Sequence, residues 1–210
     1  MPKALMPLGD SVYLDCLLEK VLNYNASHVY LSLHYKPELF QKYVESSIYI
    51  HNLTNIIEPK PLGTGGAVNY VIQNSNISSP FFVINADSLS DINLDQYFEE
   101  YVNSDLKAMV GISEVVNAER YGTVIVDDGK VLSFIEKGII GNGWINNGHY
   151  IFKKEVFEGF SGAFSLEKHL LPTLVENQGL GAFRVKNDNF IDMGIPDDYK
   201  KLNKIFMDGE

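Results

Sequence analysis

The first half of the chain alternates short apolar runs with stretches whose apolar residues recur at helical spacing. The clearest run is Phe81-Phe-Val-Ile84, which is short and continuous, as expected for a strand buried on both faces. Strands that alternate with helices predict a largely parallel sheet covered by helices. In this half we expect strands at 29–35, 48–53 and 81–84, and helices at 11–23, from Pro37, and at 67–73.

The second half interrupts this alternation with two expected hairpins. Residues 124–134 alternate around Asp128-Gly129, a dipeptide typical of tight hairpin turns, and residues 181–193 are expected to turn at Asn187-Asp188-Asn189. We therefore predict a Rossmann-like α/β fold with a mixed, mostly parallel sheet and helices on both faces. No linker or repeat divides the chain, so a single domain over residues 1–210 is expected. The remaining elements are expected as helices at 94–101, 165–176 and from Pro196 to about 206, and as strands at 108–115 and 144–152.

The charge of the chain argues against two classes of partner. Acidic side chains outnumber basic ones by 27 to 17, and the formal net charge is −10. Such a balance disfavours both a nucleic-acid-binding surface and an anionic membrane. Carboxylates can instead hold a divalent cation that bridges to a phosphorylated ligand, although a solvated acidic surface accounts for most of this charge.

Cysteine usage and hydropathy indicate where the protein works. Cys16 is the only cysteine, which excludes an internal disulfide and fits a reducing compartment. Neither a signal peptide nor a run of apolar residues long enough to span a bilayer is found, so we expect a cytoplasmic location. The composition leaves a homo-oligomer open.

A glycine-rich stretch, Pro61-Leu-Gly-Thr-Gly-Gly-Ala67, lies between an expected strand and an expected helix. Three glycines around one threonine let the backbone approach a ligand closely, with free N–H groups at a helix start. The stretch is neither the dinucleotide fingerprint nor the lysine-bearing phosphate loop, and a Gly-rich surface turn explains it equally well. It is a candidate nucleotide-binding turn.

Two carboxylates follow apolar runs. Asp87 comes directly after the 81–84 strand, where ligands bind in open α/β sheets, although a turn or helix-capping aspartate fits as well. Asp192 lies in Phe190-Ile-Asp-Met-Gly194, with the alternative that it caps the helix at Pro196. If the two meet over one cleft, they make a magnesium site, because this hard cation takes oxygen ligands and keeps phosphate oxygens as the rest.

Other polar segments flank the expected strands. In Glu136-Lys137 the lysine can hold a phosphate and the glutamate can accept hydroxyl hydrogen bonds, and an exposed ion pair is the alternative. Tyr121-Gly122-Thr123 and Asn146-Asn147-Gly148 suit close backbone approach and hydroxyl recognition, or simply turns. Lys3 is unremarkable by itself, and the histidines show neither metal-ligand spacing nor a cysteine cluster.

Taken in order, seven segments resemble the sugar-1-phosphate nucleotidyltransferases, also called nucleoside-diphosphate-sugar pyrophosphorylases. The resemblance covers nearly the whole chain, and it is greatest to the heptose-1-phosphate guanylyltransferase branch, with mannose-1-phosphate guanylyltransferases close behind. The segments are Pro2-Lys-Ala-Leu-Met-Pro7, Pro61-Leu-Gly-Thr-Gly-Gly-Ala67, Asn85-Ala-Asp87, Arg120-Tyr-Gly-Thr-Val124, Ile135-Glu-Lys137, Ile145-Asn-Asn-Gly-His-Tyr150 and Phe190-Ile-Asp-Met-Gly194.

The resemblance implies a reaction in which a sugar phosphate oxygen attacks the α-phosphorus of a nucleoside triphosphate, here GTP, and pyrophosphate leaves. The product is a nucleotide-activated sugar for surface polysaccharide synthesis. By the same resemblance Asp87 and Asp192 look like Mg²⁺ ligands, and Lys3 looks like the lysine near the transferred phosphate. It also implies that Lys137 holds the sugar phosphate, that Gly122, Glu136 and Asn146 read the sugar, and that the base and ribose are enclosed by Leu62, Gly63, Thr64, Gly65 and Gly66.

The chain departs from the family pattern in two ways. The family begins with a central strand and a Gly-Gly-x-Gly-Thr-Arg-Leu loop around the triphosphate, whereas this sequence begins at the Pro-Lys motif, so Met1 is expected not to be the natural start. Asn147 stands where the family usually has a small residue. The alternatives are therefore a truncated, non-catalytic remnant that binds nucleotide or sugar phosphate, and a transferase for CTP, UTP or dTTP. A glycosyltransferase is a third, although the Asp-x-Asp motif that it needs is not found.

Overall fold

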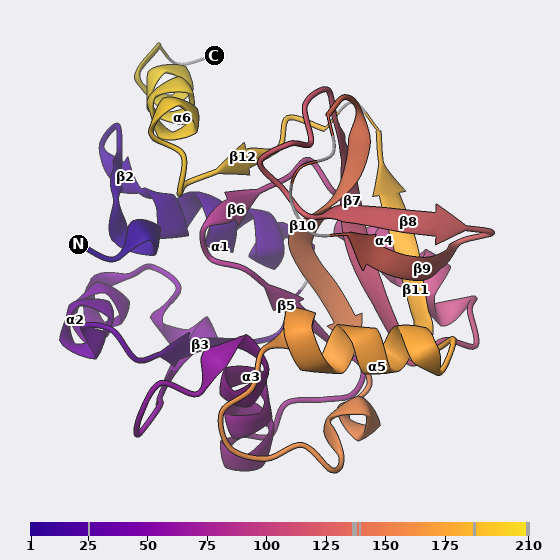
Figure 1. Ribbon diagram of the computed structural model, residues 1–210. Helices are drawn as coiled ribbons and strands as arrows, with labels where there is room; N and C mark the ends of the chain where they lie inside the picture. Colours follow the sequence, from indigo (N-terminus) through magenta and orange to yellow (C-terminus); the bar gives the residue numbers. More distant parts are fainter. Residues whose placement is uncertain (25, 136–137, 139, 187, 209–210) are drawn as a thin grey trace.

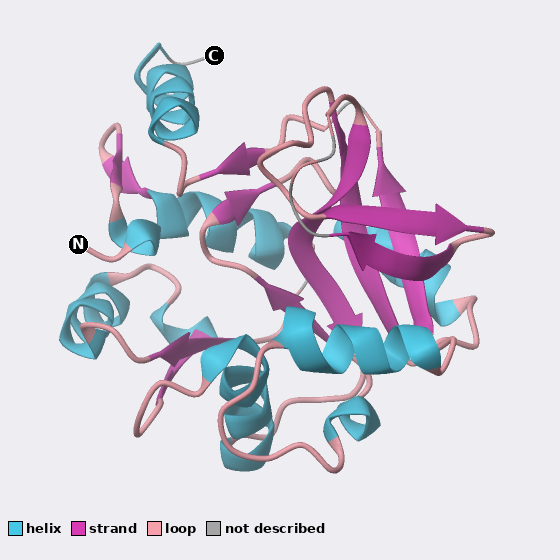
Figure 2. Cartoon of the chain, in the orientation of Figure 1, coloured by secondary structure: helices cyan, strands magenta, loops and turns pink. Residues whose placement is uncertain are grey.

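The computed structural model describes residues 1–24, 26–135, 138, 140–186 and 188–208. A large mixed sheet and a small two-stranded sheet lie on opposite sides of a gap, with helices around both (Figure 1). The sheets and the helices that cover them are coloured by type in Figure 2. Within the described residues, no helix is long and apolar enough to cross a membrane.

The large sheet has six strands in the order β5-β10-β7-β11-β9-β8. Only β7 and β11 pair in parallel; the other pairings in this sheet are antiparallel. The prediction of a mixed sheet is confirmed, but the prediction that it is mostly parallel is wrong, because β10 runs back between β5 and β7 and the β8–β9 hairpin closes the far edge. The strands are β5 (Phe81–Ile84), β7 (Ala108–Val115), β8 (Thr123–Asp127), β9 (Lys130–Ile135), β10 (Gly143–Phe152) and β11 (Leu180–Val185).

The turn between β8 and β9 forms as its sequence predicts. Asp128 and Gly129 both have positive φ, 43° and 73°, as two-residue hairpin turns require. The second expected hairpin, at 181–193, is wrong. β11 joins the large sheet, and the chain then crosses to form β12 (Ile191–Asp192), which pairs with β6 (Ser88–Leu89) in a separate ladder.

The small sheet pairs β3 (Val29–Leu33) with β4 (Leu53–Ile57) in parallel, against α1 (Tyr13–Asn23) and α2 (Pro37–Ser46). The expected strand at 48–53 is wrong: residues 50–52 form a 3₁₀ turn, and the strand begins at Leu53. Ile48 and Ile50 gave the apolar pattern, but their side chains are exposed, 86% and 40%, whereas Leu53 is buried.

Helices cover both faces of the large sheet. α4 (Leu94–Val102) packs on one face, where Tyr97 is fully buried, and α5 (Leu171–Glu176), entered through a π-type turn over Leu166–Leu170, packs on the other. The remaining elements are the short ladder of β1 (Pro7–Leu8) and β2 (Ser11–Val12), α3 (Gly63–Asn74), the 3₁₀ turns Lys3–Leu5 and Lys154–Phe157, and α6 (Pro196–Asp208).

A cavity of about 660 Å³ lies between the two sheets. Its walls include β3 and β5, together with apolar side chains of α1 and α3. β3 is paired only with β4 and β5 only with β10, so each strand has one edge without a partner among the described strands. Phe82, Val83 and Ile84 are therefore half-buried, although their run predicted a strand buried on both faces.

Candidate active site

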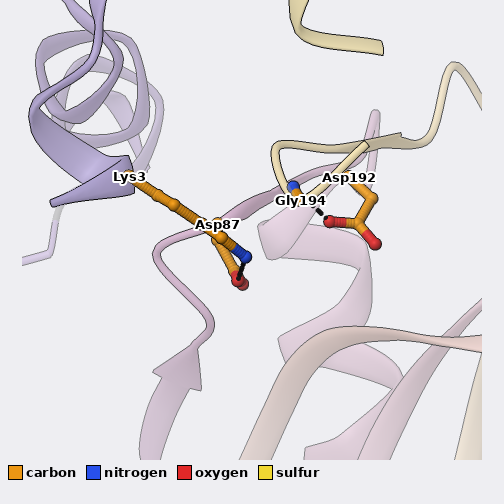
Figure 3. Close-up of polar contacts among 4 residues, drawn as sticks. All are labelled: Lys3, Asp87, Asp192 and Gly194. Carbon is orange, nitrogen blue, oxygen red and sulfur yellow. Dashed lines mark hydrogen bonds and ion pairs between the residues drawn. The ribbon is translucent and has the colours of Figure 1, made fainter. Parts of the chain in front are cut away.

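The β6–β12 ladder brings Asp87 and Asp192 together from distant parts of the sequence. Ser88 pairs with Asp192 and Leu89 with Ile191, and the Met193 amide donates to the Asp87 carbonyl at 2.9 Å. Asp87 therefore lies directly beside the end of the strand that carries Asp192. Figure 3 shows the two side chains on neighbouring segments, Asp87 in contact with Lys3 and Asp192 in contact with Gly194.

Lys3 joins this pair from the first turn of the chain. Its Nζ lies 3.0 Å from Oδ2 of Asp87, and the two side chains are 50% and 41% exposed. An ion pair this exposed stabilises a fold by only about 0–1 kcal/mol. The contact therefore matters mainly because it holds the Lys3 ammonium beside Asp87.

Gly194 allows these groups to approach one another. Its amide donates to Oδ1 of Asp192 at 2.7 Å, and a Cβ added to it would lie 2.8 Å from that oxygen and 3.0 Å from the Lys3 Nζ (Figure 3). The sequence motif contains Gly194, but only the folded chain reveals that a larger residue would separate the lysine from the carboxylates.

Neither aspartate acts as a helix cap. Within the described part of the chain, Oδ1 of Asp192 accepts a hydrogen bond only from the Gly194 amide, and the backbone amide of Asp192 donates to Asp198 at 3.1 Å. Among the residues that the structure describes, Asp87 accepts only from Lys3, through Oδ2. Each carboxylate therefore keeps one oxygen to which the described residues donate no hydrogen bond, and both side chains can bind a ligand.

These residues fit a magnesium ion. Hard oxygen donors are the ligands that Mg²⁺ prefers, and two carboxylates leave most of its octahedron to phosphate and water. The Tyr13 hydroxyl is fully buried, has no hydrogen-bond partner among the described residues, and lies near the same pair. Burial and the negative charges of Asp87 and Asp192 raise its pKa, so it stays a neutral donor. The described residues contain no group of three or more His, Cys, Asp or Glu side chains that could hold a metal alone.

The glycine-rich turn differs from its prediction. The amides of Gly65 and Gly66 are not free, because both donate to the Phe164 carbonyl, at 3.0 and 3.1 Å. A Cβ at Gly65 would lie 2.2 Å from the Phe164 ring, and one at Gly63, whose φ is +69°, would lie 2.7 Å from the Phe164 carbonyl oxygen. At Gly63 and Gly65 the missing side chain leaves room for a neighbouring segment of the protein.

Of the other residues in this stretch, Thr64 and Ala67 line the cavity between the sheets. Leu62 is buried, and its amide donates to Glu58 at 3.0 Å. Thr64 is exposed and lines the cavity, and its hydroxyl donates to Glu167 at 2.9 Å. Asn85 and Ala86 line the same cavity, so it extends from Thr64 to the two residues directly before Asp87.

The expected sugar-reading segments meet at Thr123, which pairs with Ile135 of β9 and with Ile145 of β10. Gly122 and Asn146 are therefore neighbours across the strands. Asn146 is held in place: its Nδ2 donates to the Tyr150 hydroxyl at 2.8 Å, and its Oδ1 accepts from the Gly148 amide at 3.0 Å. Glu136 and Lys137 lie outside the described residues, although β9 leads directly to them.

Comparison with known proteins gives this arrangement a family. A model of the family described as nucleotidyl transferase matches residues 1–208. The chain belongs to the nucleotidyl transferase family. Its relatives include D-glycero-alpha-D-manno-heptose 1-phosphate guanylyltransferases from Aneurinibacillus thermoaerophilus, 32% identical over 97% of this chain and 89% of the relative, and from Campylobacter jejuni, 30% identical over 95% and 88%.

Solved structures of nucleotidyl transferase relatives share the fold. HddC from Yersinia pseudotuberculosis superposes with a TM-score of 0.89 at 32% identity, covering 98% of this chain and 90% of that one, and its complex with GMP-PN gives 0.88. An apo UDP-glucose pyrophosphorylase, at 17% identity, gives a TM-score of 0.80 over 100% of this chain and 91% of that one, and so supports the fold alone. The predicted family and the predicted enzyme class are confirmed.

Proposed function

We propose that this nucleotidyl transferase transfers GMP from GTP to a heptose or mannose 1-phosphate in the cytoplasm, releasing pyrophosphate and making a GDP-sugar for surface polysaccharides. The observation that carries the proposal is the meeting of Lys3, Asp87 and Asp192 at the β6–β12 ladder. Similarity to guanylyltransferases at about 30% identity supports the base and the sugar class.

The reaction asks the protein mainly to position charge. An oxygen of the sugar phosphate forms a bond to the α-phosphorus while the bond to the bridging oxygen of the β-phosphate breaks, and pyrophosphate leaves with that electron pair. Asp87 and Asp192 hold Mg²⁺, which when bound neutralises phosphate charge. Lys3, whose Nζ lies 3.0 Å from Asp87, supplies a positive charge beside the metal ligands. There it stabilises the negative charge that develops on the phosphates in the transition state.

The two substrates enter from opposite sides of this group. Thr64 and the turn around it, with Leu62 as a buried support, form the wall for base and ribose. Gly122 and the fixed amide of Asn146 read sugar hydroxyls, together with Glu136, and Lys137 holds the sugar phosphate. Gly63, Gly65 and Gly66 belong to this wall, and the amides of Gly65 and Gly66 hold the turn against Phe164.

Measurement of pyrophosphate release tests the proposal. GTP, CTP, UTP and dTTP are each offered with mannose, heptose and glucose 1-phosphates, with the Asp87→Asn variant as the inactive control. We expect the highest rate with GTP and a heptose or mannose phosphate. A preference for CTP or UTP contradicts the guanylyl assignment.

We also propose that an apolar strand completes the sheet by pairing with the open edges of β3 and β5. The 660 Å³ cavity between those edges, lined on both sides by apolar side chains of α1 and α3, supports this. A strand there would be buried on both faces, and its end would point toward the space beside Asp87.

An extended chain tests this second proposal. An N-terminal extension with an apolar strand and a Gly-Gly-x-Gly-Thr-Arg-Leu loop should raise both the free energy of unfolding and the rate of pyrophosphate release. An extension of the same length with a scrambled, polar sequence is the matched control. Binding of GTP without pyrophosphate release in both chains would support the non-catalytic alternative.

A further inference from the structure

A buried polar cluster lies behind the two candidate metal ligands. It contains Ser90, Ser113 and Asn147, whose exposed fractions are 1%, 0% and 0%. They come from three separate parts of the fold: the segment after β6, the strand β7 and the strand β10. Buried polar side chains need partners: the two serines share a single carboxylate, that of Asp188, and Asn147 bonds to the serines.

Asp188 accepts three hydrogen bonds. Its Oδ2 accepts from the Ser90 hydroxyl at 2.6 Å and from the hydroxyl of Ser113, and its Oδ1 accepts from the Asp91 amide at 2.6 Å. Donors that share an ionised acceptor form stronger bonds than neutral pairs do. The carboxylate therefore fastens the segment after β6 to the central strand β7.

Asn147 completes the cluster from β10. Its Nδ2 donates to Ser113 at 3.0 Å and to Ser90 at 3.3 Å. Gly111 on β7 makes this possible, because a Cβ there would lie 2.6 Å from the Asn147 Oδ1. Asn147, which departs from the family pattern, thus faces away from Asn146 and the sugar side and serves this cluster.

Two further contacts fix the segment after β6 and the segment before β12. Lys20 of α1 donates from Nζ to the carbonyl of Ser90. Asp91 accepts from the backbone amide and the side-chain amide of Asn189, at 3.2 and 2.6 Å. The ladder itself pairs only two residues of each strand, too few to be stable alone, so these side-chain bonds extend it.

We propose that Asp188 is a positioning residue that sets the separation of the Asp87 and Asp192 carboxylates and thereby the affinity of the site for a divalent cation. Asp188 lies four residues before Asp192, and its partner Ser90 lies three residues after Asp87. A shift of either segment moves one carboxylate relative to the other. This inference rests on the proposed metal site.

The test measures binding of Mn²⁺ alone by the loss of the free-ion electron paramagnetic resonance signal. Asp188→Asn keeps the shape of the side chain but removes its charge, and it should weaken Mn²⁺ binding about 10-fold or more, as loss of a group that orients metal ligands typically does. Asp105→Asn, at an exposed carboxylate elsewhere, is the matched control and should bind like the parent. In turnover, Asp188→Asn should raise the Mg²⁺ concentration for half-maximal rate more than it lowers kcat at saturating Mg²⁺.

Further variants separate the outcomes. If Asp188→Asn does not fold, Ser113→Ala removes one donor and should still weaken Mn²⁺ binding measurably. Suppose that Asp87→Asn loses Mn²⁺ affinity while folded Asp188→Asn binds Mn²⁺ within twofold of the parent. That result overturns the positioning role and leaves the proposed function intact; Ser113→Ala is judged by the same criterion if Asp188→Asn does not fold. Unchanged affinity in Asp87→Asn overturns the metal site itself, and the inference with it.

Discussion

The ammonium group of Lys3 donates to the carboxylate of Asp87 across a sequence separation of 84 residues, with 3.0 Å between Nζ and Oδ2. The pair is exposed enough to be worth little for stability, and it stands beside a second carboxylate, Asp192, which is held by the Gly194 amide. The positive charge of Lys3 reduces the repulsion between the two nearby carboxylates. The ion pair therefore contributes more to holding these charged groups together than to the stability of the fold.

Replacement of Lys3 should separate activity from stability. Lys3→Met should lower kcat by roughly 10²–10³, the effect of removing one preorganised group that stabilises transition-state charge. The free energy of unfolding should change by less than about 1 kcal/mol, because the ion pair is exposed. Pyrophosphate release and urea titration measure the two. Lys107→Met, which breaks the similarly exposed pair with Glu155, is the control and should leave kcat unchanged.

A methyl group at Gly194 should impair the same site. In Gly194→Ala the added Cβ crowds Oδ1 of Asp192 and Nζ of Lys3, so one of them must move by a few tenths of an ångström or more. Displaced catalytic groups cost about 10²-fold in rate per ångström, and we expect a loss of roughly 10-fold or more. Gly179→Ala, whose Cβ meets nothing closer than 3.7 Å, is the control in the same assay. Equal rates in the two variants contradict this prediction.

Gly65 should matter for stability through Phe164. In Gly65→Ala the new Cβ overlaps the Phe164 ring, and overpacking of this kind costs about 1–3 kcal/mol. The smaller side chain of Phe164→Leu should absorb part of that overlap, so the double variant should lose less stability than the sum of the two single variants. Urea unfolding of all four proteins measures the coupling. Strict additivity would show that the ring and the glycine do not constrain each other.

His149 should make stability fall below neutral pH. Burial, helped by the charge of Lys20, lowers its pKa from 6.5 to about 4. Between pH 6.5 and about 4 this histidine is protonated in the unfolded chain but stays neutral in the folded chain. The free energy of unfolding should therefore be highest above pH 6.5 and fall between pH 6.5 and about 4, by up to roughly 3 kcal/mol.

Urea titrations between pH 4.5 and 7 measure that slope in the parent and in two variants. His149→Gln should flatten it, even if its stability at pH 7 is lower. His51→Gln, at an exposed histidine, should keep the slope of the parent. A His149→Gln protein with an undiminished slope would assign the pH dependence to other groups.

Local chemistry made part of the fold predictable. The Asp128-Gly129 turn, the Phe81–Ile84 strand and the helix beginning at Pro37 depend on a few neighbouring residues, and the structure has all three. The motif order also pointed to Asp87, Asp192 and Lys3, which the fold brings together.

Features that depend on distant neighbours could not be read in this way. The glycines at 63–66 suggested room for a ligand, but the space beside them is filled by Gly162 and Phe164, about a hundred residues away. The apolar run around Ile48 and Ile50 resembled a strand, although nothing in the described structure buries those two side chains. The crossing from β11 to β12 was hidden because a ladder of two residue pairs leaves no periodic pattern.

The β6–β12 ladder also determines when the site can form as the chain folds. Its two strands are about a hundred residues apart in sequence, and most of the large sheet lies between them. Closing so long a loop has an entropic cost that the ladder's own few bonds cannot repay, so the sheet must form first and hold the two ends near each other. During refolding, helix and strand content should therefore recover before the capacity to bind a cation, and a chain stopped short of Asp192 would be largely folded yet unable to react.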